Sequence, residues 1–316
     1  MRKLVLISFL LVFAHSGFSQ NDSLVKKLDS LSQQPNKPSS KDNEIDPSAY
    51  NKNTTFTIPG FVTLQWSNLK QSFTKPFHMS GHDWGLVAKF ALLTGALALA
   101  DESIQRFALD LRNHNSSLRT IGRQVTNFGG PYEGYTLGAF GAYGLLFNNK
   151  KMQTVTLLAV QSYLTGAGVQ YVLKFLSGRQ RPYVTDSVHT EADPVFHGPF
   201  AKLRDAEGNR YNGSFPSGHT TVAFAAATVF ALEYRDKPWV PVFCYTAASL
   251  IGLSRITENR HWATDVIAGG AVGYLVGRQV VNNYHRFVRL KTSKNPVSFS
   301  LDCRYGQLVP EITYRF

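Results

Sequence analysis

The sequence predicts an all-α domain that follows a polar N-terminal segment and precedes a short β-hairpin. Hydrophobic residues make up 43% of the 316 positions, which is enough for a sizeable core and excludes a wholly disordered chain. From Trp84 onward, apolar stretches of helical length alternate with turn signals. Beyond Lys291, apolar residues instead alternate with polar ones, a pattern typical of β-strands.

The apolar stretches predict a series of helices that mix small and large apolar side chains. Turn signals at Gly129-Gly130-Pro131, Asn148-Asn149 and Lys237-Pro238 separate several of them. The second stretch is amphipathic, so we expect it to form one helix on the surface. A long polar loop, about 183–214, separates the fourth helix from the fifth. The expected helices cover residues 84–100, 103–125, 134–148, 152–177, 217–234, 239–256 and 262–284.

The N-terminus has the pattern of a secretory signal peptide. Arg2 and Lys3 precede an apolar run from Leu4 to Ala14, and small and polar residues follow as far as Gln20. That run is too short to cross about 30 Å of hydrocarbon. We therefore expect a signal peptide over 1–20, a disordered polar tether and lead-in segment over 21–83, the helical domain over 84–290, and a β-like tail over 291–316.

Charge and cysteine content narrow the possible partners. A formal net charge of +12 indicates an anionic partner. The basic residues are scattered singly and form no stripe interleaved with aromatic residues, so we expect no nucleic acid partner. Two distant cysteines, Cys244 and Cys303, exclude a disulfide framework and a cysteine-rich zinc site. A phosphate-bearing substrate and an anionic membrane surface remain.

Three clusters of the sequence are rich in groups that suit an anion. The first is Lys174-Phe-Leu-Ser-Gly-Arg179-Gln-Arg181-Pro182, at the end of an expected helix. The second is Gly213-Ser214-Phe215-Pro216-Ser217-Gly218-His219-Thr220, which opens another helix. The third is Ser254-Arg255, followed after five residues by His261 and then by Asp265. Each cluster alone has an ordinary structural explanation, but the three together indicate a phosphate site.

The first requirement of such a site is to neutralise the phosphoryl oxygens. The guanidinium groups of Arg181 and Arg255 can bind phosphate through two parallel hydrogen bonds, and Lys174 adds a point charge. Ser217 and Gly218 lie at a helix start, where we expect free backbone N–H groups and the helix dipole to face the same anion. These residues supply the positive charge without a metal, so we expect no metal and no cofactor.

The two histidines supply the nucleophile and the acid that a two-step phosphate transfer needs. Asp265 lies four residues after His261, so we expect both on one face of a helix, with the carboxylate orienting the imidazole. This makes His261 the expected nucleophile and His219 the expected general acid. Arg179 either contacts the substrate or supports the site from behind.

The pattern Lys174-x6-Arg181-Pro182, Pro216-Ser217-Gly218-His219 and Ser254-Arg255-x5-His261-x3-Asp265 resembles the three signature motifs of the type 2 phosphatidic acid phosphatase (PAP2) superfamily. This group includes bacterial class A acid phosphatases, lipid phosphate phosphatases and vanadium haloperoxidases. The resemblance covers about residues 84–284. It implies a helical bundle in which Lys174, Arg181, Ser217, Gly218 and Arg255 hold the phosphate. It also implies the same roles for His261, His219 and Asp265 as the residues suggest.

The expected function is metal-independent hydrolysis of a phosphomonoester or pyrophosphate of an envelope lipid, through a phosphohistidine. Phosphatidate, undecaprenyl pyrophosphate and a lipid A phosphate are candidate substrates. We expect the domain to associate with a membrane surface of the cell envelope, with its site facing the periplasm. The number of helices that span the membrane stays open. Three alternatives also stay open: a soluble periplasmic acid phosphatase of broad specificity, a vanadate-dependent haloperoxidase and a non-catalytic envelope binding protein.

Overall fold

The computed structural model describes residues 57–183, 193–201, 211–293, 297–304 and 307–314, together with Lys26, Ser30, Leu203, Arg204 and Gly208. The expected signal peptide lies outside the described residues. So does the expected tether as far as residue 56, apart from Lys26 and Ser30.

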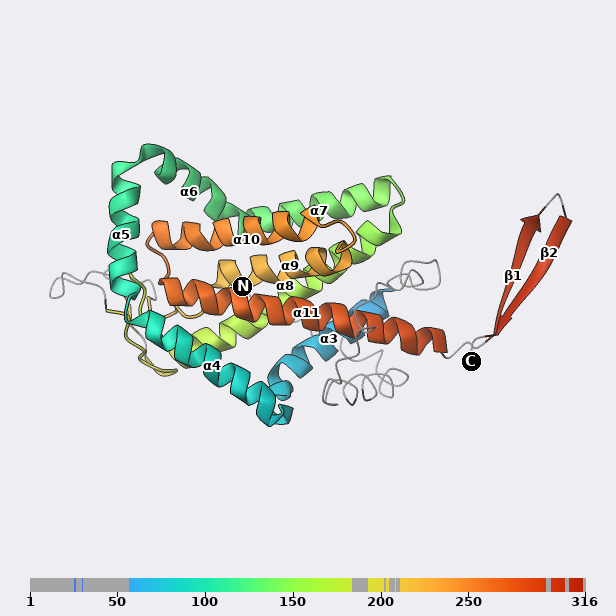
Figure 1. The fold of residues 1–316 in the computed structure, drawn as a ribbon, viewed down its shortest axis with the longest axis horizontal. Helices are drawn as coiled ribbons and strands as arrows, with labels where there is room; N and C mark the ends of the chain where they lie inside the picture. Colours follow the sequence, from blue (N-terminus) through green and yellow to red (C-terminus); the bar gives the residue numbers. More distant parts are fainter. Residues whose placement is uncertain are drawn as a thin grey trace.

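The described part of the chain is mainly α-helical and ends in one β-hairpin, which confirms the predicted fold class (Figure 1). In the hairpin, β1 and β2 pair antiparallel, with Val297 opposite Tyr314 and Arg304 opposite Gln307. The hairpin stands beyond the end of the last helix. The elements are α3 Ile58–Thr74, the 3-10 helix η3 Lys75–His78, α4 Gly81–Ala98, α5 Asp101–His114, α6 Ser116–Phe128, α7 Pro131–Leu146, α8 Lys150–Ser177, α9 Gly218–Glu233, α10 Trp239–Thr257, α11 Ala263–Ser293, β1 Val297–Arg304 and β2 Gln307–Tyr314.

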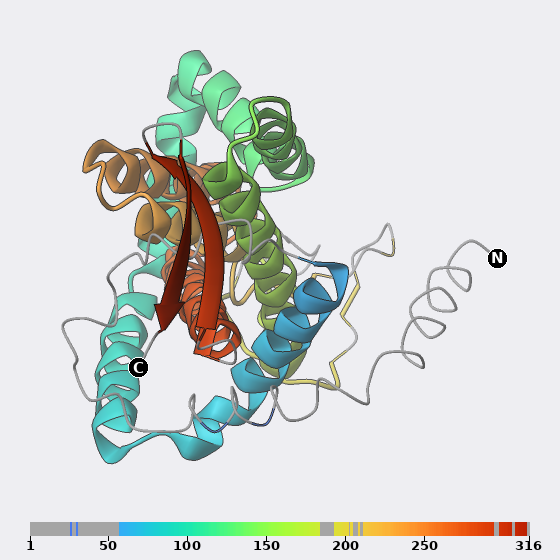
Figure 2. The same cartoon turned by 90° about the vertical axis from the view of Figure 1, so that its right-hand side faces the viewer.

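Helix α9 is the centre of the bundle and packs against α8, α10 and α11 (Figures 1 and 2). Its close approach to α11 depends on Gly269, Gly273 and Gly277 of α11, which are spaced four residues apart. A Cβ at Gly269 would lie 2.7 Å from the Ser217 carbonyl oxygen, and one at Gly277 would lie 2.6 Å from that of Ala225. Such distances exclude a side chain, so these glycines let the two backbones meet. This contact places the start of α11 against the start of α9.

The segment expected as one surface helix over 103–125 is two helices. The prediction was wrong because the chain breaks at Asn115, which has an extended backbone between α5 and α6. The Asn115 side chain accepts a hydrogen bond from the Leu118 amide at 3.1 Å and so caps α6. The apolar periodicity continues across this break, which is why the pattern alone suggested one helix.

The lead-in segment before residue 84 contains helix α3, which packs against α8 and α11. Gln161 of α8 donates to the Phe61 carbonyl at 2.9 Å, and Gln279 of α11 donates to the Asn68 carbonyl at 2.7 Å. The described helices of the bundle therefore begin at Ile58.

Among the described helices, α10 alone is long and apolar enough to cross a membrane. Helices α4 and α5 would count as a second span if their 57° bend lies within one broken span. A buried helix of a soluble protein can meet the same criterion.

Candidate active site

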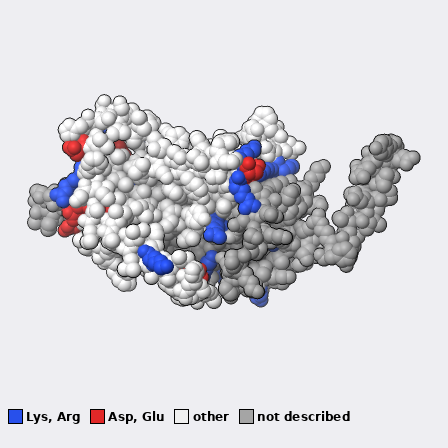
Figure 3. Space-filling model, viewed as in Figure 1, with Lys and Arg blue, Asp and Glu red and all other residues white. Residues whose placement is uncertain are grey.

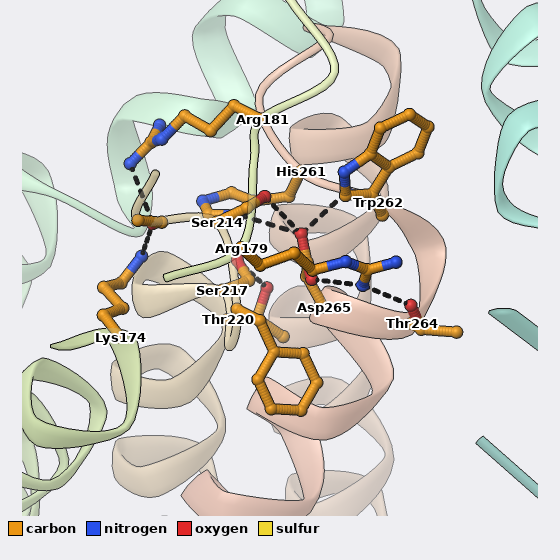
Figure 4. A network of polar contacts seen from close by, with 12 residues as sticks. Lys174, Arg179, Arg181, Ser214, Ser217, Thr220, His261, Trp262, Thr264 and Asp265 are labelled. Atoms are coloured by element: carbon orange, nitrogen blue, oxygen red, sulfur yellow. Dashed lines mark hydrogen bonds and ion pairs between the residues drawn. The ribbon is translucent and has the colours of Figure 1, made fainter. Parts of the chain in front are cut away.

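The three sequence clusters meet at one end of the bundle, where α8 and α10 end and α9 and α11 begin (Figure 4). The turn after α8 depends on Gly178, which has a φ of 55° in the left-handed region. A Cβ there would also collide with the carbonyl of Gly198. This turn sends the chain from Lys174 directly past Arg179 and Arg181 and toward the second cluster.

Lys174 and Arg181 converge on one point of the second cluster. The Lys174 Nζ donates to the Gly213 carbonyl at 2.8 Å, and an Arg181 Nη lies 3.4 Å from the same oxygen (Figure 4). Arg255, at the end of α10, is held by a 2.9 Å hydrogen bond to the hydroxyl of Thr126 in α6. The structure therefore brings the three predicted phosphate-binding cations to one site.

The crowding of these cations changes the protonation of their neighbours. Burial, and then repulsion by Arg181, lower the pKa of Lys174 to about 7. Burial, and then repulsion by Arg255 and Lys174, lower the pKa of His219 to about 3. The pKa of His261 lies well below its ordinary value for the same reasons, burial first and Lys174 next. Both imidazoles are therefore neutral at pH 7 in the anion-free site, and an incoming phosphate dianion would raise all three pKa values.

The start of α9 faces this site, but Ser217 takes part differently from the expectation. Its amide is not free, because it donates to the Asp265 carbonyl at 2.9 Å, and its hydroxyl accepts from Thr220 at 2.8 Å. The first hydrogen bond within the helix runs from the Thr221 amide to the Ser217 carbonyl. The amides of Gly218, His219 and Thr220 thus precede that bond and are the donors that α9 can offer an anion.

His261 and Asp265 do not share a helix face as predicted. His261 lies before α11, which begins at Ala263, and Asp265 is in the first turn. The helix starts there because one Asp265 oxygen turns back to accept the Trp262 amide at 2.9 Å, as a capping carboxylate does. The same oxygen lies 3.6 Å from His261 Nδ1 and accepts a short hydrogen bond from Ser214. Asp265 does lie beside His261, but the capping turn at the start of α11 brings them together rather than a shared helix face.

The second oxygen of Asp265 binds Arg179. From the sequence, Arg179 could have contacted either the substrate or the other residues of the site. One Nη of Arg179 donates to Asp265 Oδ1 and to Thr264 Oγ1, each at 2.7 Å, and the other donates to Asp101 Oδ2 at 2.7 Å. Arg179 is 1% exposed and both carboxylates are fully buried. Burial raises the pKa of Asp265, while Arg179 favours its ionised form. Arg179 therefore holds Asp265 in position through Oδ1, the oxygen that does not lie beside His261.

Asp101, Ser214 and Thr264 complete this network. The sequence indicated no role for Asp101 and Thr264, and it included Ser214 only as a member of the second cluster. Asp101, in the first turn of α5, accepts the Thr264 amide at 3.1 Å and also the Thr264 hydroxyl. It is separated from Arg179 by 78 residues, and no spacing rule links positions so far apart. The network ties the corner between α4 and α5 to the carboxylate beside His261.

His219 packs against two glycines that had been recognised only as a turn signal. A Cβ at Gly129 would lie 2.9 Å from the His219 Cβ, and one at Gly130 would lie 3.2 Å from Nε2. The turn between α6 and α7 thus sets the space available to this imidazole.

Among the described residues, no group of three or more His, Cys, Asp or Glu side chains could hold a metal ion.

Part of the chain matches a known protein family. Residues 155–289 match the family model of the PAP2 superfamily. The chain therefore contains a PAP2 superfamily domain over these residues. The matched range contains all eight predicted site residues, whereas Asp101, Gly129 and Thr126 lie before it.

Curated relatives of the superfamily are phosphatases. The chain is 57% identical over 79 residues to a lipid A 1-phosphatase of Porphyromonas gingivalis, a match that covers 25% of this chain but only 17% of that protein. It is 28% identical over 173 residues to the undecaprenyl-diphosphatase BcrC of Bacillus subtilis, covering 53% of this chain and 75% of that protein. A crystal structure of a transmembrane PAP2 type phosphatidylglycerolphosphate phosphatase from Bacillus subtilis is similar with a TM-score of 0.47 and 24% identity, covering 64% of this chain and 95% of that one.

Proposed function

We propose that this protein removes a phosphate group from a phosphorylated lipid of the cell envelope through a phosphohistidine on His261. The observation that supports this most is the convergence of Lys174, Arg181 and Arg255 with two neutral imidazoles at the amino end of α9. Three cations gathered at one site repel one another, and binding an anion offsets that repulsion. Two imidazoles beside it suit transfer in two steps.

In the first step, His261 attacks phosphorus through Nε2, because its Nδ1 faces Asp265 and Ser214 at 3.6 and 3.5 Å. A P–N bond forms while the P–O bond to the leaving group breaks. Asp265 stabilises the positive charge that develops on the imidazole, and the three cations stabilise the phosphoryl oxygens.

His219 donates a proton to the leaving oxygen in this step. Its pKa of about 3 in the empty site is too low for an acid at pH 7, so the bound phosphate dianion must first offset the repulsion from Arg255 and Lys174. His219 is then neutral and takes a proton from the water that attacks the phosphohistidine. The P–N bond breaks, phosphate leaves and His261 is restored.

The molecular surface favours a lipid substrate over a small soluble ester. In Figure 3, most charged residues lie toward the two ends of the visible face, and the area between them is largely uncharged apart from basic residues in its lower part. Large apolar side chains are exposed on several helices, among them Leu92 of α4 at 75%, Leu146 of α7 at 81% and Phe243 of α10 at 66%. Such a surface fits contact with lipid. The names of two relatives given above are those of lipid phosphatases. We propose that the site of this protein faces the periplasm.

The proposal is tested by measuring phosphate release from a panel of lipid phosphates, lipid diphosphates and soluble phosphoesters, in detergent and with EDTA. Wild type should prefer lipid substrates and retain its activity in EDTA. His261→Ala should lose at least about a thousandfold in kcat. A matched control is His114→Ala, because His114 also pairs with an aspartate four residues away, at 3.2 Å, but both are exposed.

A phosphoenzyme trapped from wild type should be stable in alkali and labile in acid, as a phosphoramidate is, and should be missing from His261→Ala. Normal turnover by His261→Ala would refute the nucleophile. Release confined to soluble esters would favour a soluble acid phosphatase, and loss of activity in EDTA would overturn the metal-free mechanism.

A further inference from the structure

Arg260 directly precedes His261 but has no part in the mechanism above. After α10 ends, Asn259 adopts a left-handed φ of 56°, and the amides of Arg260 and His261 both donate to the Arg255 carbonyl, at 3.0 and 3.3 Å. This tight turn places two successive side chains in opposite surroundings. His261 is 1% exposed, whereas Arg260 is exposed to solvent.

The ring of Tyr183 holds the Arg260 guanidinium beside the first cluster. The guanidinium carbon of Arg260 lies 5.1 Å from the centre of the Tyr183 ring, and that of Arg181 lies 6.0 Å from the same ring. Burial lowers the pKa of Arg181, and repulsion from Arg260 adds to this effect. Among the residues that the structure describes, no carboxylate forms an ion pair with Arg260.

The cations of the site form a series from the interior to the solvent. Arg255 is 7% exposed, Arg181 is half-buried and Arg260 is exposed. Lys174, Arg181 and Arg255 lie near His261, where the proposed mechanism places the reacting phosphoryl group. Arg260 is an additional, exposed guanidinium beside this site.

We propose that Arg260, held over Tyr183, is a second anion-binding position that takes a second phosphoryl group joined to the reacting one. The inference rests on the proposed function and adds a specificity-determining residue, one that distinguishes diphosphate esters from monophosphate esters. A diphosphate places its second, charged group just outside the inner site, where a planar guanidinium can bind two of its oxygens. A monophosphate ester has no group that needs Arg260.

The test compares two esters of one alcohol, farnesyl diphosphate and farnesyl monophosphate, in detergent micelles. Arg260→Gln should lower kcat/KM for the diphosphate about tenfold, the value of one charge-assisted hydrogen bond at a partly exposed site, and should change it for the monophosphate less than about threefold. The diphosphate reaction should also lose part of its salt dependence. Arg235→Gln, which removes an exposed arginine in the turn between α9 and α10, is the control and should change neither reaction.

Two further variants separate charge from geometry. Tyr183→Leu should show the same selective loss as Arg260→Gln because it removes the ring, whereas Tyr183→Phe should retain wild-type discrimination. Equal losses on both esters in Arg260→Gln, or no loss on either, would overturn the inference while the proposed function stands. A wild type that cleaves only the monophosphate would overturn it too. A wild type that cleaves no lipid phosphate of the panel would instead overturn the proposed function, and this inference with it.

Discussion

Replacing Arg179 with glutamine tests the buried network that supports the active site. The guanidinium lies between Asp101 and Asp265, with donor–acceptor distances of 2.7 Å to each carboxylate, and all three side chains are at most 1% exposed. Glutamine can retain one hydrogen bond but not the charge. Two buried carboxylates would then face each other across the site without a counter-charge.

The expected loss of stability is large. Breaking a buried ion pair by removing one partner costs about 3–5 kcal/mol, because the remaining charge stays buried and unpaired. For a domain of this size, about 1 kcal/mol shifts Tm by about 2–4 °C, so we expect Tm to fall by about 10 °C. Arg106→Gln is the control. Its partner Glu102 lies at 3.6 Å and both side chains are largely exposed, so the loss should stay below about 1 kcal/mol.

The loss should also depend on pH in a specified direction. Burial already raises the pKa of Asp265, and without Arg179, which favours the ionised form, the pKa of Asp265 in the folded state rises further above its unfolded value. The folded protein then binds more protons than the unfolded chain in the window between those values, so its stability falls as pH rises through that window. The Tm deficit relative to wild type should therefore be smaller at pH 5 than at pH 8.

Thermal unfolding in detergent at both pH values and phosphate release at pH 7 measure these effects. We expect kcat to fall while KM changes little, because Asp265 loses its orientation but Lys174, Arg181 and Arg255 remain. Asp101→Asn combined with Arg179→Gln should be less destabilising than the sum of the two single changes. If Arg179→Gln lowered Tm no more than Arg106→Gln does, or left kcat unchanged, the supporting role of the network would be refuted.

Three further predictions follow from the same site. Gly129→Ala should destabilise by about 1–3 kcal/mol and lower kcat at least tenfold, because its Cβ would lie 2.6 Å from Ile251 Cγ2 and 2.9 Å from the His219 Cβ. Gly134→Ala in α7, with nothing within 4 Å, should be tolerated. In the free enzyme, kcat/KM for a phosphate monoester should fall as pH rises through about 7, because Lys174 then loses its charge, and Lys174→Arg should move this loss to higher pH. Orthovanadate at about 100 times its Kd should stabilise the protein by about 2.7 kcal/mol, and the gain at the same concentration should shrink in Arg255→Gln.

Each of these has a contrary outcome that a single assay would show. Equal thermal unfolding and equal kcat for the two glycine variants would mean that the α6–α7 turn does not confine His219. A kcat/KM that stays flat up to pH 9 would assign Lys174 no part in binding. An equal vanadate shift in Arg255→Gln and wild type would place the anion elsewhere.

Local features of the sequence determined much of the fold. The turn signals at Gly129-Gly130, Asn148-Asn149 and Lys237-Pro238 fall between described helices, and the alternation after Lys291 became a hairpin. These features act over a few residues, so periodicity and turn chemistry suffice to find them. The break at Asn115 was missed because a short polar turn does not interrupt the apolar periodicity.

The side chains of the site could also be identified from the sequence, because few types of side chain bind phosphate well. Their arrangement in space could not be predicted from the sequence. Only the packing of α9 on glycines of α11 brings Ser217 to Asp265, and only the fold brings Asp101 to Arg179, 78 residues away. A buried carboxylate needs partners on several sides, and those partners come from whichever segments the tertiary structure places there. The residues that act on phosphate were therefore readable in the chain, whereas those that hold them in position were decided by packing.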